Sequence, residues 1–229
     1  MTSIIKIPRK TFVDGELFYA SQTSNALRNC QEDCDALFMP EVIDARISSP
    51  NESPLWQNFL SAPSVRATGV IKGEPVVVYA HVPNHFSNPD NIELSIQNGL
   101  RNGAGIIPQD EFQRFYDMVD NERVFLVDYN KLLKSTSGVI KVKDALQHPQ
   151  TIPFLGGKER AGLYLEEHER NFGPNIGVLL SNDLQLDGLS VARVLHVGDG
   201  LYGFVHLDDG ARFVGVRRVA EGDEREITE

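Results

Sequence analysis

The hydrophobic positions near the end of the chain have the spacing of β-strands. Apolar segments of strand length occur at residues 191–197, 201–207 and 211–219. They are separated by Gly198-Asp199-Gly200 and Asp208-Asp209-Gly210, which have the composition of tight turns. Such turns need residues that tolerate positive φ. The pattern therefore predicts a C-terminal three-stranded antiparallel meander.

The rest of the chain mixes strand patterns with helical patterns. Apolar segments around turn signals predict a hairpin or two short strands at 6–19 and a hairpin at 65–82. Helical spacing predicts helices at 24–38, 91–101 and 158–171 and one that begins at Pro108. Further strands are expected at 124–127, 139–142 and 175–181. Because helices gather in the middle and hairpins at both ends, we predict an α+β fold with a mixed or mainly antiparallel sheet.

The order of these elements predicts one main domain with a smaller C-terminal unit. We assign residues 1–183 to an α+β core domain. We assign 184–220 to the β-meander, which is expected to pack on the same core. Residues 221–229 are mostly acidic and are expected to form a disordered tail. A chain of 229 residues with 41% apolar content is long enough to bury one substantial core.

The charge of the chain limits the classes of partner. Its net charge of -10 disfavours broad binding to nucleic-acid phosphates or anionic membranes, because both need a basic surface. No apolar run approaches the ~18 residues of a membrane span, and residues 1–10 lack the apolar core of a secretory signal. We therefore expect a cytoplasmic protein that binds neither nucleic acid nor membrane.

Cys30 and Cys34 are the cysteines of the chain, and they share one face of the helix predicted at 24–38. Free cysteines are commonly buried as small apolar side chains. We therefore expect both thiols to be reduced, buried and metal-free. A zinc site with His81 and His85 is compatible with the spacing within each pair. The long gap between the pairs is, however, unlike a zinc-finger module.

The densest group of polar side chains follows a strand pattern. Val76-Val77-Val78 leads into a loop from His81 to Asp90 that holds two histidines and two asparagines. Strand ends that open into polar loops are common places for binding and catalytic groups. Neutral imidazole is a metal ligand and a proton shuttle near neutral pH. The pattern indicates a candidate site in this loop.

The leading hypothesis is therefore an enzyme that acts on a small polar substrate, with hydrolysis as the candidate reaction. His81 or His85 would act as general base or as metal ligand, with a divalent metal as the cofactor that they could hold. Asn84, Ser87 and Asn88 would orient the substrate. Asp128, which follows the strand at 124–127, would supply a carboxylate.

Two alternatives remain open at this point. The polar residues of the loop can build turns and a helix N-cap at Asp90, and Asp128 can cap the segment that follows it. The chain would then be a non-catalytic interaction or adaptor protein whose C-terminal meander presents an edge strand or an aromatic surface to a protein partner. That surface would consist of Tyr202, Phe204 and Phe213. An enzyme should show converging histidines in a pocket, whereas an adaptor should show an exposed apolar patch.

Overall fold

The computed structural model describes residues 4–8, 12–119, 122–135, 137–185 and 187–218, with side chains from residue 15 onward. Its strands are β1 (Ile4–Pro8), β2 (Phe12–Ala20), β3 (Cys34–Ala36), β4 (Leu60–Ile71), β5 (Glu74–Ala80), β6 (Gly105–Ile106), β7 (Val124–Asp128), β8 (Gly138–Lys141), β9 (Asn175–Leu180), β10 (Val191–Val197), β11 (Gly200–Gly203) and β12 (Ala211–Arg217). Its helices are α1 (Thr23–Asp33), α2 (Met39–Ile47), α3 (Pro54–Gln57), the 3₁₀ helix η1 (His85–Ser87), α4 (Pro89–Gln97), α5 (Gln109–Asp117), α6 (Tyr129–Leu133), α7 (Val142–Ala145), α8 (Thr151–Leu155) and α9 (Lys158–Phe172).

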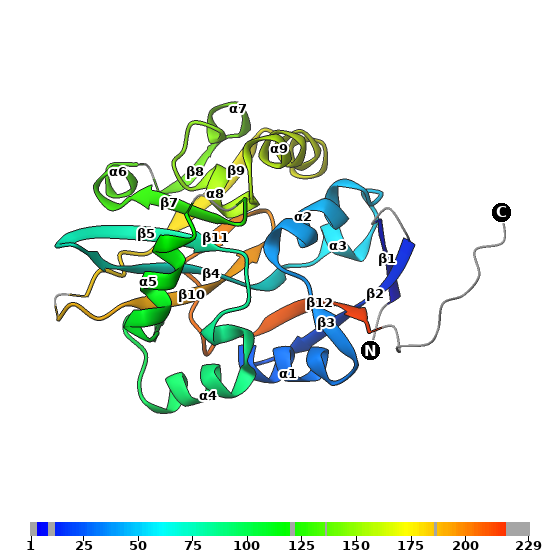
Figure 1. Ribbon diagram of the computed structural model, residues 1–229. Coiled ribbons are helices and arrows are strands. Elements are labelled where there is room, and N and C mark those ends of the chain that lie inside the picture. The colour runs from blue at the N-terminus through cyan, green and yellow to red at the C-terminus, as the bar shows by residue number, and fades with distance from the viewer. Residues whose placement is uncertain (1–3, 9–11, 120–121, 136, 186, 219–229) are drawn as a thin grey trace.

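The strands of the described residues form a 12-stranded mixed sheet. Its main path is β1-β2-β12-β4-β10-β11-β9-β8, and β3, β5, β6 and β7 pair off this path. Most neighbours are antiparallel, while β11 with β9 and β12 with β4 are parallel. In Figure 1, α7 and α9 lie on one side of the sheet and α1 and α4 lie on the other.

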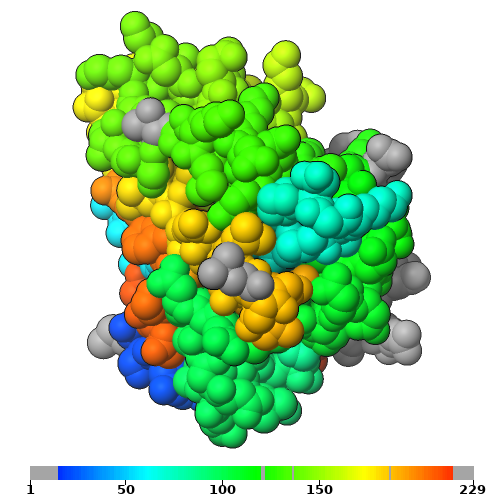
Figure 2. Space-filling view, turned by 90° about the vertical axis from the view of Figure 1, so that its left-hand side faces the viewer, coloured from blue at the N-terminus to red at the C-terminus, as the bar shows by residue number. Residues whose placement is uncertain are grey.

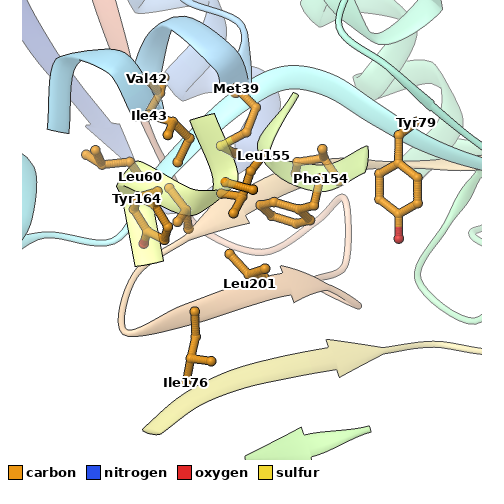
Figure 3. Close-up of a cluster of buried hydrophobic side chains, with 14 of the residues drawn as sticks. Met39, Val42, Ile43, Leu60, Tyr79, Phe154, Leu155, Tyr164, Ile176 and Leu201 are labelled. Atoms are coloured by element: carbon orange, nitrogen blue, oxygen red, sulfur yellow. The ribbon is translucent and has the colours of Figure 1, made fainter. Parts of the chain in front are cut away.

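Each face of the sheet has its own hydrophobic core. One core joins the strands to α2, α8 and α9, and Figure 3 shows its packing around Leu155 and Tyr164. The other joins the strands to α1, α4 and α5. The consecutive residues Val194 and Leu195 belong to different cores, as expected for neighbours on a strand that is buried on both faces.

A break in the pairing of β4 with β10 affects the interior. Val194 pairs with Val65, but the next residue, Leu195, pairs with Ala62. The two skipped residues, Pro63 and Ser64, form a bulge, which bends a strand and redirects its side chains. Ser64 is thereby placed in the interior, where it is fully buried.

The predicted α+β class with a mixed, mainly antiparallel sheet is confirmed. The β1–β2 and β4–β5 pairs form at the predicted places, and α9 spans nearly the predicted residues. The helix predicted at 24–38 is shorter, because α1 ends at Asp33 and Cys34 begins β3. Met39 and Pro40 then start a separate helix, α2.

β10 and β12 form close to the predicted places, whereas β11 ends at Gly203, four residues before the predicted end, and β12 pairs differently. β10 pairs with β11 as expected, whereas β12 pairs with β2, β3 and β4. Hydrophobic spacing locates a strand without choosing its neighbours, so the meander order could not be read from it. Gly200 and Gly210 are also not among the residues with positive φ. The predicted tail at 221–229 lies outside the described residues.

Candidate functional site

His81 follows the end of β5 and is completely buried. Its Nε2 lies 2.8 Å from the carbonyl oxygen of Pro153, and its Nδ1 lies 2.9 Å from the hydroxyl of Ser64. A carbonyl oxygen only accepts, so Nε2 carries the proton and Nδ1 accepts from Ser64. Burial lowers the pKa of His81 to about 3, which keeps the ring neutral. Both ring nitrogens are therefore used to join β5 to the β4 bulge and α8.

The other polar residues of the loop make local turns and caps. The side-chain oxygen of Asn84 accepts from the backbone N–H of Phe86 at 2.9 Å, and Ser87 Oγ accepts from the backbone N–H of Asn84 at 3.0 Å. Together they form a capping box around η1. Asn88 accepts from the N–H of Asp90 at 2.9 Å and is the N-cap of α4, two residues before the predicted cap.

His85 and Asp128 do not form a site with His81. The half-buried ring of His85 packs against Phe86, with 5.3 Å between the ring centroids. Asp128 pairs with Val76 at the start of β5, whereas His81 follows the other end of that strand. Five residues of strand separate the two positions, which corresponds to about 16 Å. The Asp128 carboxylate instead caps the N-terminus of α6.

The thiols have the buried environment expected from the sequence. Cys30 and Cys34 are free and completely buried, and desolvation raises the pKa of both. Among the residues that the structure describes, no cluster of three or more His, Cys, Asp or Glu side chains could hold a metal ion. The expectation of a possible metal site is therefore corrected, because both ring nitrogens of His81 are already hydrogen-bonded and Asp128 lies at the other end of β5.

A different surface is organised by the segment from Asp199 to Asp208. Its residues alternate between buried and accessible positions, although regular strand structure ends at Gly203. We call the accessible alternates the outward row: Tyr202, Phe204, His206 and Asp208. The buried alternates are the inward row: Leu201, Gly203, Val205 and Leu207. Figure 2 shows orange atoms of this C-terminal part at the surface, between the green atoms around β8 and the blue atoms of the N-terminal part.

Buried arginines hold the backbone of this segment, and the residues just before it, from inside. Arg46 donates to the carbonyl oxygens of Val197 at 3.1 Å and Gly198 at 2.8 Å. Arg193 donates to the carbonyl oxygens of Phe204 at 2.7 Å and Val205 at 3.1 Å. Both guanidinium groups are completely buried. These bonds involve main-chain atoms, so they do not depend on which side chains the outward row carries.

Asp183 ties Arg193 to a second buried arginine. Its carboxylate lies 2.7 Å from Arg66 NH1 and 2.8 Å from Arg193 NH2, and all three side chains are at most 2% exposed. Arg66 also reaches the carbonyl oxygen of Gly203, at 3.5 Å. Sequence reasoning missed this network. The sequence feature that could have revealed it is an arginine among apolar residues in each of two predicted strands, Arg66 and Arg193.

The aromatic surface predicted for the C-terminal strands is present in part. Tyr202 and Phe204 lie edge to face with 6.0 Å between ring centroids, and Phe59 packs on Tyr202 at 5.8 Å. Phe213 is completely buried in the core between the sheet and α1, so it does not belong to this surface. His196 is also buried, beneath the ring of Phe59.

The charge of this surface is negative. Asp199, Asp208 and Asp209 are exposed, and no lysine or arginine occurs between residues 198 and 210. In the outward row, His206 has its Nδ1 3.9 Å from a carboxylate oxygen of Asp208. The outward row therefore presents aromatic and acidic side chains on a backbone that buried arginines anchor.

Comparison with known proteins gives one informative similarity. No family model and no curated protein match the chain. A solved structure described as "Accommodation of massive sequence variation in Nanoarchaeota by the C-type lectin fold" is 49% identical to it, with a TM-score of 0.87. The similarity covers 93% of this chain and 100% of the other.

This similarity overturns the hypothesis of a hydrolytic enzyme. A protein of C-type lectin fold at such identity points to non-catalytic binding, which agrees with the structural roles of His81 and Asp128. The alternative of an interaction protein is the better interpretation. In the part of the chain that the structure describes, no helix has the length and apolar character needed to cross a membrane.

Proposed function

The chain belongs to the family of this nanoarchaeal protein of C-type lectin fold, and from that premise we propose that it is a non-catalytic binding protein that contacts its partner through the outward row. The observation that carries the proposal is the alternation of accessible and buried residues along 201–208. The inward row supplies the core contacts. The outward row is left available for recognition.

The anchoring of the backbone supports the same proposal. Arg66 and Arg193 hold carbonyl groups of this segment and Arg46 holds that of Gly198 just before it, and these bonds remain whatever side chains the outward row carries. The solved relative is described as accommodating massive sequence variation within its fold. We extend that capacity to this chain and assign it to the outward row, where a substitution changes the contact surface without opening the core.

The proposed partner is a protein. Tyr202 and Phe204 supply rigid aromatic contact area, and aromatic side chains are enriched at the centres of protein interfaces. Asp199 and Asp208 stand at the two ends of this segment, where rim charges of an interface commonly lie. These features favour an accessible surface of contact over an enclosed small-molecule site.

Two displayed libraries of variants of this chain test the proposal. Because the outward and inward rows alternate along the same segment, each library is a matched control for the other. One library randomises the outward row and the other randomises the inward row. Clones of the first library should remain folded by protease resistance and should yield binders when selected on purified lysozyme as a probe protein. Clones of the second should mostly lose protease resistance. Equal loss in both libraries, or an outward-row library that folds but never yields binders, would contradict the proposal.

A further inference from the structure

A cavity of about 160 Å³ lies where α6 and the end of β9 meet. Its walls include the polar residues Arg66, Ser137 and Asn182 and the apolar residues Leu132, Leu133 and Leu180. We propose that this cavity is a binding site for a carboxylate that carries a short apolar tail. This ligand differs from the protein partner of the outward row, so the inference goes beyond the proposed function.

The first argument is an excess of buried positive charge beside the cavity. Two buried arginines, Arg66 and Arg193, share the single carboxylate of Asp183. The three side chains together therefore carry a net charge of +1. Arg66 is 1% exposed, and its Nε has no hydrogen-bond partner among the described residues. A buried cation without a matching anion is costly, and a bound anion would neutralise it.

The second argument is the supply of hydrogen-bond donors on the cavity wall. Ser137 Oγ already accepts from the backbone N–H of Leu180 at 3.2 Å, which leaves its O–H to donate. The side-chain oxygen of Asn182 accepts from the Tyr129 hydroxyl and from the N–H of Leu184. Its NH₂ group has no acceptor among the described residues. No aspartate or glutamate is among the described residues that line the cavity, so the exposed donors of Ser137 and Asn182 have no carboxylate beside them, whereas Arg66 already donates to Asp183 through NH1.

The chemical character of the lining indicates the kind of ligand. A carboxylate accepts several hydrogen bonds and pairs well with a guanidinium. Ser137 and Asn182 would donate to this head group, and the buried charge of Arg66 behind them would attract it. The leucine side chains would cover a tail of a few carbon atoms, which the size of the cavity allows.

Thermal unfolding with small ligands tests the site. The full chain is heated with increasing sodium propionate at pH 7 and constant ionic strength, with sodium chloride and propionamide in parallel. A ligand that binds the native state raises the unfolding temperature in a saturable way. We expect this rise with propionate alone. An equal rise with chloride would mean a general salt effect and would overturn the proposal, and an equal rise with propionamide would show that the charge is not recognised.

Two variants and a control connect the effect to the cavity. Asn182→Asp keeps both accepted hydrogen bonds and places a carboxylate in the site, so the response to propionate should disappear. Leu133→Trp adds volume at a half-exposed wall residue and should weaken binding at least about tenfold by steric exclusion. Asn51→Asp, in an exposed loop, makes the same charge change and should leave the response unchanged. If Asn182→Asp responds to propionate like the unmodified chain, the proposal fails, whether or not Leu133→Trp folds.

Discussion

The replacement of Asp183 by alanine is the most direct perturbation of the scaffold behind the outward row. Asp183 accepts from Arg66 NH1 at 2.7 Å, from Arg193 Nε at 2.9 Å and NH2 at 2.8 Å, and from Ser181 Oγ at 2.8 Å. Its side chain is 2% exposed, and those of the arginines are 1% and 0% exposed. In Asp183→Ala, two buried guanidinium groups would therefore lose their shared carboxylate without gaining water.

The expected cost follows from what is left unpaired. Breaking a buried ion pair by removal of one partner costs about 3–5 kcal/mol, mainly through the uncompensated charge that remains. Two cations lose the same partner here, so we expect the free energy of unfolding of Asp183→Ala to fall by at least that amount. The isosteric Asp183→Asn keeps one acceptor oxygen, so its loss should be smaller, about 2–3 kcal/mol. Typical domains are stable by about 5–15 kcal/mol, so these losses are measurable.

Urea unfolding at pH 7 is the assay, with Asp187→Ala as the control. Asp187 lies 3.7 Å from Arg101, and the two side chains are 49% and 50% exposed. An exposed ion pair of this kind is worth about 0–1 kcal/mol. If Asp183→Ala lost no more stability than Asp187→Ala, Asp183 could not be holding the buried arginines in place.

The pH dependence gives an independent check of the same reasoning. Burial by itself raises the pKa of Asp183, but the hydrogen bonds and positive charges of Arg193 and Arg66 outweigh it and lower the pKa below its usual value. The carboxylate therefore stabilises the fold at all pH values above its unfolded pKa of about 4, and this stabilisation is lost as the pH falls through the folded value. The difference in stability between the unmodified chain and Asp183→Asn should stay constant from pH 7 to 5 and narrow below pH 4. A difference that narrowed already between pH 7 and 5 would mean that another group is responsible.

Three further predictions concern the interior. In Gly200→Ala, the new Cβ would lie 2.8 Å from a carbonyl oxygen of β9, so the urea midpoint should fall by an amount equivalent to about 1–3 kcal/mol; an unchanged midpoint would refute the close approach of β11 to β9. Burial lowers the pKa of His81 and His196 to about 3, whereas an unfolded histidine takes up a proton near pH 6.5. The free energy of unfolding should therefore fall as the pH is lowered from 7 to 5, with uptake of up to two protons by these histidines on unfolding. A free energy of unfolding that stays constant over this range would contradict the prediction. The thiols of Cys30 and Cys34 should react with an aromatic disulfide reagent only after unfolding, and rapid reaction of the native protein would show that they are accessible.

Much of the secondary structure could be predicted from local pattern. The β4–β5 hairpin, α9 and the start of α5 lie close to their predicted residues, because each has a long periodic apolar face or a clear turn or proline signal. The helix at 24–38 was predicted too long, since Cys34 and Leu37 fit a helical face in sequence but lie beyond the end of α1 at Asp33. Periodicity describes one face of an element and does not reveal where the partner surface ends.

The candidate site also shows what could be predicted from local sequence pattern and what could not. His81 and Asp128 attracted attention because each follows an apolar strand, and a sequence cannot show that opposite ends of β5 separate them. The aromatic residues Tyr202 and Phe204 were identified as a surface, whereas Phe213 was placed there wrongly because β12 lies in the middle of the sheet.

The fold class, the places of most strands, the burial of Cys30 and Cys34 and the negative charge of the chain follow from the sequence alone. These are local or summed properties, which follow from the order and number of residue types. Tertiary contacts, by contrast, place β12 beside β2 instead of β11, anchor the backbone of the outward row to Arg66 and Arg193, and occupy both nitrogens of His81. Each of these depends on contacts between residues far apart in the chain, where burial, pairing and distance are set by packing of the whole molecule.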